Sequence, residues 1–494
     1  MSDLPKPISS SSSSSMVENQ LLLFLLIIAI IYFLTQSVTF FQDVPDLYLK
    51  QQSIVEPTRL LNESPIYHSS KFRDLRVGLD IRYDNYKLRN GNLNDIWEIL
   101  IKLSKEFDKG ILINNEKLSI SYINYCIHTA DFKHVNTILV PKNHPLDAKW
   151  LITLLIGFVK QLTVEFYIDL PLTTTDTIHI SDIKLPNVND DKAKRFFEFT
   201  NVYTPAKDKG IAIRLHNNIS NGINSIVEFT QLNIVSAVAS TLKHLPNSDK
   251  YYGSKLTIIS SNQSNEDIND IIVKTLTGFL LYSEIIITDR VSIINEIDDE
   301  DLSSLSNTSS IISLPESQLM KVFTGHSSDT ILQLIQRYLL TRGVFPFKKK
   351  PRKLMYIHGS INSKSTLGYY ELNSLRLRYK SRVIKELGYY NVVGPIILTD
   401  YNDYRQFDKL NHDFRKFGCL SQSLEIKLFN LSKNNWGNLM VRGYTIGKTI
   451  NVVNGNKEEA QSKDNDGFMP INIVKLFLPV VAVVVAVSSE TLSK

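Results

Sequence analysis

Small polar residues that can hold a phosphate group occur together at residues 217–222, which read Asn-Asn-Ile-Ser-Asn-Gly. Apolar stretches at residues 211–213 and 226–229 flank this cluster and predict two β-strands. Thr230 then stands where the N-cap of a helix is expected. Backbone amides and short polar side chains between elements of an α/β sheet commonly bind nucleotide phosphates. An ordinary turn between two strands explains the same residues, and both interpretations stay open.

Several other chemistries are not indicated by the sequence. Cys126 and Cys419 are the two cysteines, and their number and separation give neither a disulfide framework nor a metal motif. The ten histidines show no ligand spacing, and no G-x-S-x-G motif is present. The acidic run at residues 298–301 lacks the spacing of a calcium loop. A formal net charge of +5 over 494 residues, without a basic-aromatic pattern, argues against nucleic-acid binding.

The stretch around residues 217–222 resembles the phosphate loop of the adenylate-forming superfamily, which includes acyl-CoA synthetases, luciferases and nonribosomal-peptide adenylation domains. The cluster takes the first six positions of that loop, among them Asn217, Asn218, Ser220, Asn221 and Gly222. Ser225 takes the position of the family's lysine, and Gln231 that of its histidine. The resemblance therefore implies a vestigial nucleotide site that has lost most of its glycines and its cation.

Segments further along the chain resemble the family in the same order. Residues 353–359 resemble the strand that enters the family's Gly-Gly-Ala loop, where this chain has Gly359 and Ser360. The resemblance makes these two residues part of the vestigial nucleotide site.

Residues 396–400 resemble the family's Tyr-Gly-x-Thr-Glu motif. The resemblance implies that Thr399 contacts phosphate and that Asp400, a shorter acid, binds magnesium. These two would be the catalytic residues if the chain is active. Ile396 replaces the aromatic residue that stacks on adenine in the family.

The last matching segments are residues 437–443 and 466–473. Asn472 stands where the family's aspartate binds the ATP ribose, and an amide offers one acceptor and one donor, so it is a poorer clamp. A complete family member continues into a mobile C-terminal domain with a catalytic lysine, whereas this chain ends at Lys494. No lysine is assigned that role.

Predicted helices and strands alternate along most of the chain. Helices are expected at residues 95–107, 147–159 and 268–281, and strands at residues 110–113, 135–141, 162–167, 255–260, 284–288 and 353–357. This order predicts a parallel, doubly wound sheet. With the resemblance, it implies an α/β fold of the multi-subdomain AMP-binding type found in the N-terminal domain of acyl-CoA synthetases.

An uncharged and strongly apolar stretch covers residues 21–41, which is long enough for a transmembrane helix. A buried core helix is the alternative, while the flanking residues do not fit a cleaved signal peptide. The excess of Lys and Arg after the stretch predicts that the main domain is cytosolic. The expected membrane is that of the endoplasmic reticulum or of a lipid droplet. The expected domains are a disordered serine-rich tail (1–19), the span (20–41), an adenylate-forming-like domain (42–472) and a hydrophobic tail (473–494) that is either buried or in contact with the membrane.

Two functions are compatible with these features. The first is a membrane-anchored, acyl-CoA synthetase-like protein of lipid metabolism without ligase activity, which binds an acyl chain, an acyl-CoA or a protein partner as a scaffold or regulator. The alternative is a divergent long-chain fatty acid–CoA ligase that uses ATP and magnesium as cofactors. Adenylation brings a carboxylate to a triphosphate and needs concentrated positive charge, so the lost lysine favours the first function.

Overall fold

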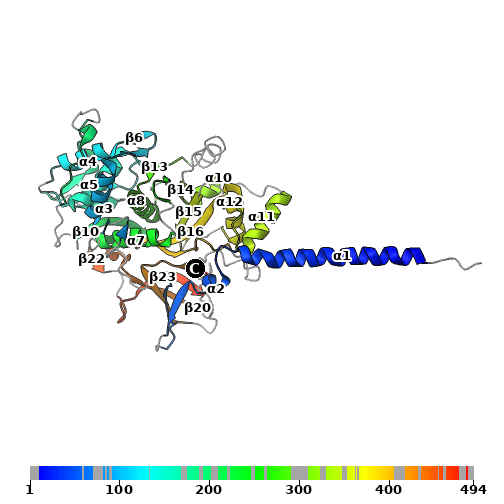
Figure 1. Ribbon diagram of the computed structural model, residues 1–494. Helices are drawn as coiled ribbons and strands as arrows, with labels where there is room; N and C mark the ends of the chain where they lie inside the picture. The colour runs from blue at the N-terminus through cyan, green and yellow to red at the C-terminus, as the bar shows by residue number, and fades with distance from the viewer. Residues whose placement is uncertain are drawn as a thin grey trace, which may run out of the picture.

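A mixed nine-stranded sheet forms the centre of the computed structural model (Figure 1). The structure describes residues 11–57, 61–70, 82–83, 86–87, 92–132, 134–168, 175–187, 193–201, 210–219, 223–245, 251–260, 264–290, 310–322, 330–347, 353–361, 363, 367–404, 418–431, 436–453, 456–459, 463–477 and 486–487. The strands of this sheet follow the order β18-β17-β16-β15-β14-β12-β13-β5-β6. They are β5 (Ile111–Ile113), β6 (Glu116–Leu118), β12 (Lys255–Ile259), β13 (Glu284–Thr288), β14 (Ser310–Pro315), β15 (Lys353–Ser360), β16 (Arg382–Tyr389), β17 (Val392–Leu398) and β18 (Cys419–Leu420).

The strands from β5 to β16 in this order pair in parallel, as the βα alternation predicted. The strands at the two edges pair antiparallel instead. Strand β6 follows β5, and β17 follows β16, through short connections, and such connections can join only antiparallel neighbours. The prediction of a doubly wound parallel sheet is therefore confirmed for the centre of this sheet.

Two further sheets flank the centre. The seven-stranded sheet contains β7 (Thr137–Pro141), β8 (Thr163–Tyr167), β9 (Thr177–His179), β10 (Ile211–Ile219), β11 (Ile223–Thr230), β21 (Lys448–Val453) and β22 (Asn456–Glu459). The six-stranded sheet contains β1 (Ser53–Glu56), β2 (Ile66–Ser69), β19 (Leu424–Phe429), β20 (Trp436–Gly443), β23 (Met469–Phe477) and β24 (Ala486–Val487), and a separate hairpin pairs β3 (Arg82–Tyr83) with β4 (Tyr86–Lys87).

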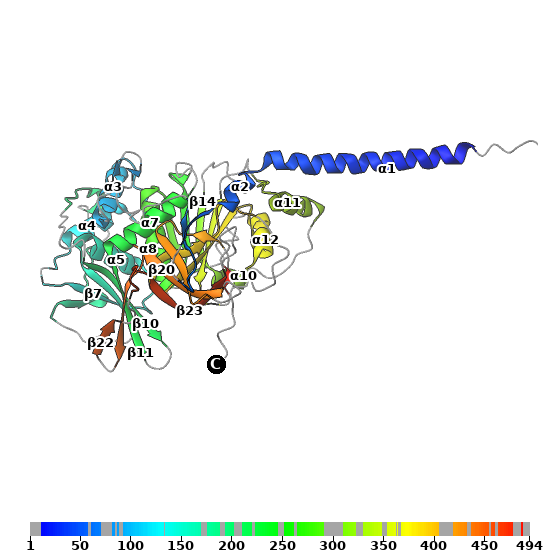
Figure 2. The same cartoon turned by 90° about the horizontal axis from the view of Figure 1, so that it is seen from below.

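The helices cover the faces of these sheets (Figure 2). They are α2 (Asp46–Lys50), α3 (Leu93–Ser104), α4 (Ile120–Thr129), α5 (Ala148–Lys160), α7 (Gln231–His244), α8 (Asn265–Leu280), α10 (Glu316–Val322), α11 (Ile331–Thr341) and α12 (Tyr369–Tyr379), with 3-10 turns at Ile180–Asp182 and Ala193–Arg195. One apolar core joins α3, α5, α7 and α8 to strands of both larger sheets. Every residue of α8 except Glu266 is buried, so its polar side chains must find partners inside the protein.

The polar cluster at residues 217–222 is part of a hairpin. Strand β10 runs to Ile219 and β11 begins at Ile223, so Asn217 and Asn218 belong to the ladder and not to a loop. The antiparallel ladder extends further than predicted because every residue from 213 to 219 finds a partner in β11.

The apolar N-terminal stretch forms most of helix α1 (Ser11–Ser37), which projects away from the body in both views (Figures 1 and 2). A 3-10 turn, η1 (Val38–Phe41), follows, so the α-helix ends before the predicted boundary at residue 41. Among the described residues, no helix combines the length and the apolarity that crossing a membrane requires. The predicted transmembrane helix is therefore not supported by the structure.

Two glycines beside the end of β16 allow the packing of β17 to be tested. Gly394 has a φ of +78°, and a Cβ there would lie 3.4 Å from Cβ of Ala237. We expect Gly394→Ala to lower the free energy of unfolding by about 1–2 kcal/mol, because L-residues are strained in this region. At Gly388, a Cβ would make ordinary contacts of 3.7 Å and longer, so Gly388→Ala should change stability far less. Chemical denaturation measures both, and equal losses would contradict this account of β17.

Candidate functional site

The carboxyl ends of parallel strands are the usual place for a ligand in an open α/β sheet. In the nine-stranded sheet, these ends include Ser360 of β15, which pairs with Gly388 of β16. His358 lies two residues before Ser360 and pairs with Pro315 of β14. The polar part of this region faces helix α8, which packs against β15 and β17.

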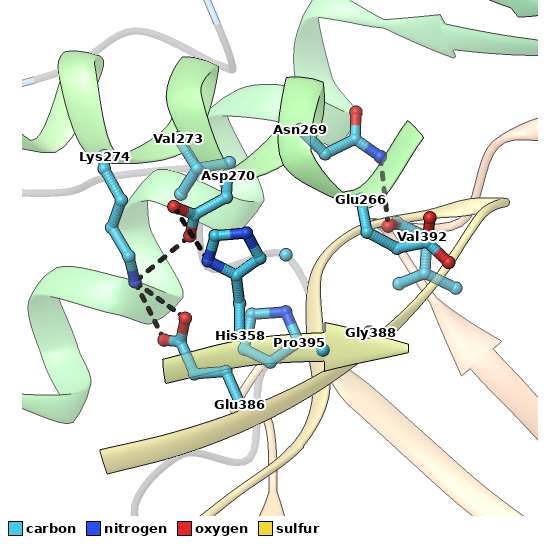
Figure 3. A pocket seen from close by; sticks show the side chains of 12 residues that line it. Glu266, Asn269, Asp270, Val273, Lys274, His358, Glu386, Gly388, Val392 and Pro395 are labelled. Carbon is cyan, nitrogen blue, oxygen red and sulfur yellow. Dashed lines mark hydrogen bonds and ion pairs between the residues drawn. The ribbon is translucent and has the colours of Figure 1, made fainter. Parts of the chain in front are cut away.

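A small cavity lies between α8, β15, β16 and β17 (Figure 3). Its volume is about 30 Å³. The lining residues are Glu266, Asn269, Asp270, Val273, Lys274, His358, Gly359, Glu386, Gly388, Val392, Gly394 and Pro395. A cavity of this size has room for about one water molecule.

A buried ion pair closes one side of the cavity. The Lys274 ammonium donates to both carboxylate oxygens of Glu386, at 2.8 and 3.0 Å, and the two side chains are 3% and 4% exposed. The same nitrogen lies 3.9 Å from a carboxylate oxygen of Asp270 and 3.6 Å from the centre of the Tyr356 ring. Burial raises the pKa of Glu386, although the charge of Lys274 opposes the shift.

His358 lies between two carboxylates of α8. Its Nε2 is 2.9 Å from Oδ1 of Asp267, and its Nδ1 is 3.4 Å from Oδ2 of Asp270 (Figure 3 shows the Asp270 side). Ser313 donates to Oδ2 of Asp270 at 2.7 Å. Burial alone would lower the pKa of His358, but Asp270 and Asp267, with Glu386, raise this pKa to about 8.

The charges of this cluster do not favour the binding of an anion. Asp267, Asp270 and Glu386 supply three carboxylates, whereas Lys274 and His358 supply at most two positive charges, both already paired. Among the described residues, the buried hydroxyl of Tyr356 has no hydrogen-bond partner, and burial raises the pKa of this hydroxyl well above its ordinary value. The arrangement can hold and share protons among buried groups, and it offers no free cation to a phosphate.

The sequence places three members of this cluster on one face of α8. Asp267, Asp270 and Lys274 are three and four residues apart, which is the spacing of neighbours on a helix surface. The hydroxyl of Ser264 accepts the amide of Asp267 and fixes the start of the helix. Sequence reasoning missed this cluster, because the same spacing also fits a solvated helix face. The sequence does contain a signal that this helix is buried: apolar residues occur on every side of it, between the charged ones.

Gly359 and Ser360, predicted to lie in a loop, are the last two residues of β15, and Gly359 lines the cavity. Thr399 lies elsewhere: its amide donates to the carbonyl oxygen of Lys385, and its hydroxyl accepts the Lys385 amide, each at 2.9 Å. Because β17 runs antiparallel to β16, Thr399 is level with Lys385, three residues before Gly388. Three residues along a strand span about 10 Å.

Asp400 is 1% exposed and has partners of its own. Its Oδ1 accepts the amide of Asn402 at 2.9 Å, and its Oδ2 accepts the hydroxyl of Tyr48 at 3.2 Å. These bonds tie the segment after α1 to the main body. Within the described part of the chain, no group of three or more His, Cys, Asp or Glu side chains is placed to hold a metal ion.

The other predicted site residues lie on different sheets. Asn217 pairs with Ser225 in the seven-stranded sheet, where the buried Ser225 hydroxyl donates to the Asn217 carbonyl oxygen at 3.4 Å. Asn218 follows in the same strand, and Asn472 belongs to β23 of the six-stranded sheet. Ser220, Asn221 and Gly222 lie outside the described residues.

Comparison with known proteins relates this fold to acyl-activating enzymes. The chain is similar to o-succinylbenzoate CoA synthetase of Bacillus subtilis in complex with its acyl-adenylate intermediate, at 11% identity and a TM-score of 0.50, over 79% of this chain and 77% of the other. It is equally similar to the luciferase-like enzyme of the nonluminescent mealworm Zophobas morio, at 11% identity and a TM-score of 0.50, over 83% and 97% of the two chains. The chain therefore has the fold of the adenylate-forming superfamily.

Sequence comparison adds one relative of unknown activity. The uncharacterized protein YHR045W of Saccharomyces cerevisiae is 23% identical over 83% of this chain and 87% of its own length. No protein-family profile matches the sequence.

Removing the positive charge of the buried Lys274–Glu386 pair should destabilise the folded protein strongly. We expect Lys274→Met to lower the free energy of unfolding by about 3–5 kcal/mol, because the Glu386 carboxylate is left buried without its partner. The double variant Lys274→Met, Glu386→Gln should recover much of this loss. Lys102→Met is the matched control, since Lys102 forms a similar 2.7 Å pair with Glu98 but is half exposed, and it should cost less than about 1 kcal/mol. Denaturant unfolding measures all three, and a small effect of Lys274→Met would contradict the buried pair.

The protonation of His358 should make stability depend on pH. Its pKa is about 8 in the folded protein and has an ordinary value of 6.5, so protonated His358 stabilises the fold fully below about pH 6.5. This contribution, about 2 kcal/mol, is lost as the pH rises through 8. Unfolding measured between pH 6 and 9 should show the loss, and His358→Gln should flatten it. The same pH dependence in both proteins would rule out His358 as its source.

Proposed function

We propose that this chain is an acyl-CoA synthetase-like protein of lipid metabolism that binds acyl groups but does not carry out the ligase reaction. The adenylate-forming fold supports the acyl part of the proposal, because structural neighbours with this fold act on acyl groups activated by ATP or CoA. The architecture of the cavity region supports the loss of ligase activity.

The observation that carries the proposal is the size and charge of the cavity at the carboxyl ends of β15 and β16. Small-molecule sites usually enclose about 300–1,000 Å³. The cavity between α8 and these strands is about 30 Å³, so a nucleotide does not fit among the residues present. Expanding the cavity would require breaking the Lys274–Glu386 pair, which holds α8 against β16.

Charge opposes a nucleotide at the same place. Transferring an acyl group to AMP needs preorganised cations or donors where phosphate charge develops, and losing one such group typically lowers the rate by about 10²–10³. Lys274 and His358 are the basic side chains that line the cavity, and carboxylates engage both. A triphosphate placed here would also approach Asp270 and Glu386. ATP and magnesium are therefore not cofactors in this proposal.

The membrane part of the proposal depends on helix α1. Its apolar side chains are exposed from Leu21 to Phe33, and it stands clear of the body in both views (Figures 1 and 2). Such a surface is stable in water only if lipid or protein covers it. We place the protein on the endoplasmic reticulum or a lipid droplet, with α1 in the bilayer and the domain of residues 42–472 in the cytosol, where it can meet acyl chains and acyl-CoA.

The ligase reaction provides the test. Full-length protein with fatty acid, CoA, magnesium and ATP should release no pyrophosphate above background, while a fluorescent acyl-CoA should still bind. Asp400→Ala should leave both results unchanged, because Asp400 already serves Tyr48 and Asn402. Ser225→Lys should not create activity, since Ser225 lies in the β10–β11 hairpin.

The alternative ligase would give a different pattern. Robust pyrophosphate release that depends on fatty acid and disappears in Asp400→Ala would overturn the proposal and establish a divergent ligase. Absence of both turnover and acyl-CoA binding would reject acyl groups as the ligand.

A further inference from the structure

Helix α11 (Ile331–Thr341) presents an apolar face that is exposed in the described part of the structure. Ile331, Leu332, Leu334 and Ile335 are each at least 53% exposed, and the next turn adds the exposed Tyr338. These positions recur at the spacing of one helix face. A capping box between Thr330 and Gln333 fixes the first turn, so the helix needs no other partner to begin.

Polar contacts hold α11 to the body and turn this face outward. Arg337 donates to the hydroxyl of Ser374 on α12 at 3.2 Å, and its guanidinium stacks 4.2 Å from the centre of the Tyr370 ring. Apolar packing is confined to the last turn, where Leu340 is buried with Phe345, Leu377 and Tyr404. The first two turns of α11 therefore contribute little to the core of the protein.

The position of α11 relates it to α1. In both views α11 lies at the end of the body from which α1 projects (Figures 1 and 2). The segment that leaves α1 is bonded to the end of α11, since the amide of Asp43 donates to the carbonyl oxygen of Gly343 at 2.9 Å. The exposed Phe40 and Phe41 of η1 come directly before this bond. A bilayer that holds α1 would therefore lie next to α11.

The charges in the sequence of α11 indicate the kind of surface that it fits. Arg337 and Arg342 are the charged residues within 330–347, and the sequence continues with basic residues at 348–350, 352 and 353. An apolar helix face with basic residues and no acidic ones fits the interface of a membrane with anionic headgroups.

We propose that α11 is an interfacial membrane-binding helix that lays its apolar face into an anionic phospholipid bilayer. This inference rests on the proposed membrane attachment through α1. Two attachments would fix the orientation of the body, whereas α1 alone would leave it free to rotate. The cavity beside β15 and β16 would then keep a constant distance and angle from the bilayer.

Single-cysteine labelling of the full-length protein tests the proposal. Cys126 and Cys419 are both buried, so an environment-sensitive fluorophore can be placed on Leu334→Cys with little background. Ile28→Cys reports on α1, and Phe107→Cys reports on an exposed position three residues after α3. Helix α3 lies at the end of the body away from α1 (Figure 1). The labelled proteins are reconstituted into vesicles of phosphatidylcholine and phosphatidylserine that contain a brominated lipid.

The proposal expects the Leu334 probe to shift its emission to shorter wavelength, to be quenched by brominated lipid and to be protected from aqueous iodide. The Phe107 probe should show the opposite behaviour. A Leu334 probe that iodide quenches while the Ile28 probe contacts lipid would overturn the role of α11 and leave the α1 attachment intact. Protection of the Leu334 probe from both quenchers would show that protein covers α11, which also overturns the proposal. Loss of lipid contact at both positions would reject the membrane attachment itself.

Discussion

The buried ion pair between Lys274 and Glu386 is the interaction on which the arrangement of this site depends. It joins α8 to β16, and it is completed by the contact of Lys274 with Asp270 and with the ring of Tyr356. Buried charges are tolerated only when they are paired, so α8 cannot slide or tilt without leaving a charge uncompensated. The same interaction closes one side of the small cavity beside β15 and β16.

Keeping a fold and losing its reaction are physically separate events. The fold follows from the apolar core that joins α3, α5, α7 and α8 to the two larger sheets, and this core needs only volume and patterning. The reaction needs a few polar groups at fixed positions, and these can be replaced without disturbing the core. Here the region that could have held a phosphate is occupied by Asp267, Asp270 and Glu386 together with their two partners. In this fold, carboxylates outnumber the basic side chains in the cluster beneath α8.

Sequence reasoning succeeded where a short pattern fixes a local structure. The strand at residues 284–288 was predicted with the bounds that the structure shows, because a short β-branched apolar run favours a buried strand over a helix. The helix expected at residues 147–159 is α5, displaced by one residue at each end. Asp147 caps it through a hydrogen bond to the amide of Trp150.

The candidate site could not be predicted in the same way, since it depends on pairing between distant strands. The sequence prediction contained no strand at residues 382–389, so the place of Thr399 and Asp400 became clear only once β17 was seen to turn back along β16. Likewise, His358 meets Asp267 and Asp270 only because β15 lies under α8. The hairpin at residues 217–222 reads the same as a phosphate loop until its partners in β11 and β21 are known.

If the carboxylate-lined cavity beneath α8 excludes a nucleotide, calorimetric titration of the full-length protein with magnesium and ATP should show no saturable heat of binding at millimolar ATP. Saturable binding of ATP to the unmodified protein that is weakened by Gly388→Val, which would fill the cavity, would contradict the account.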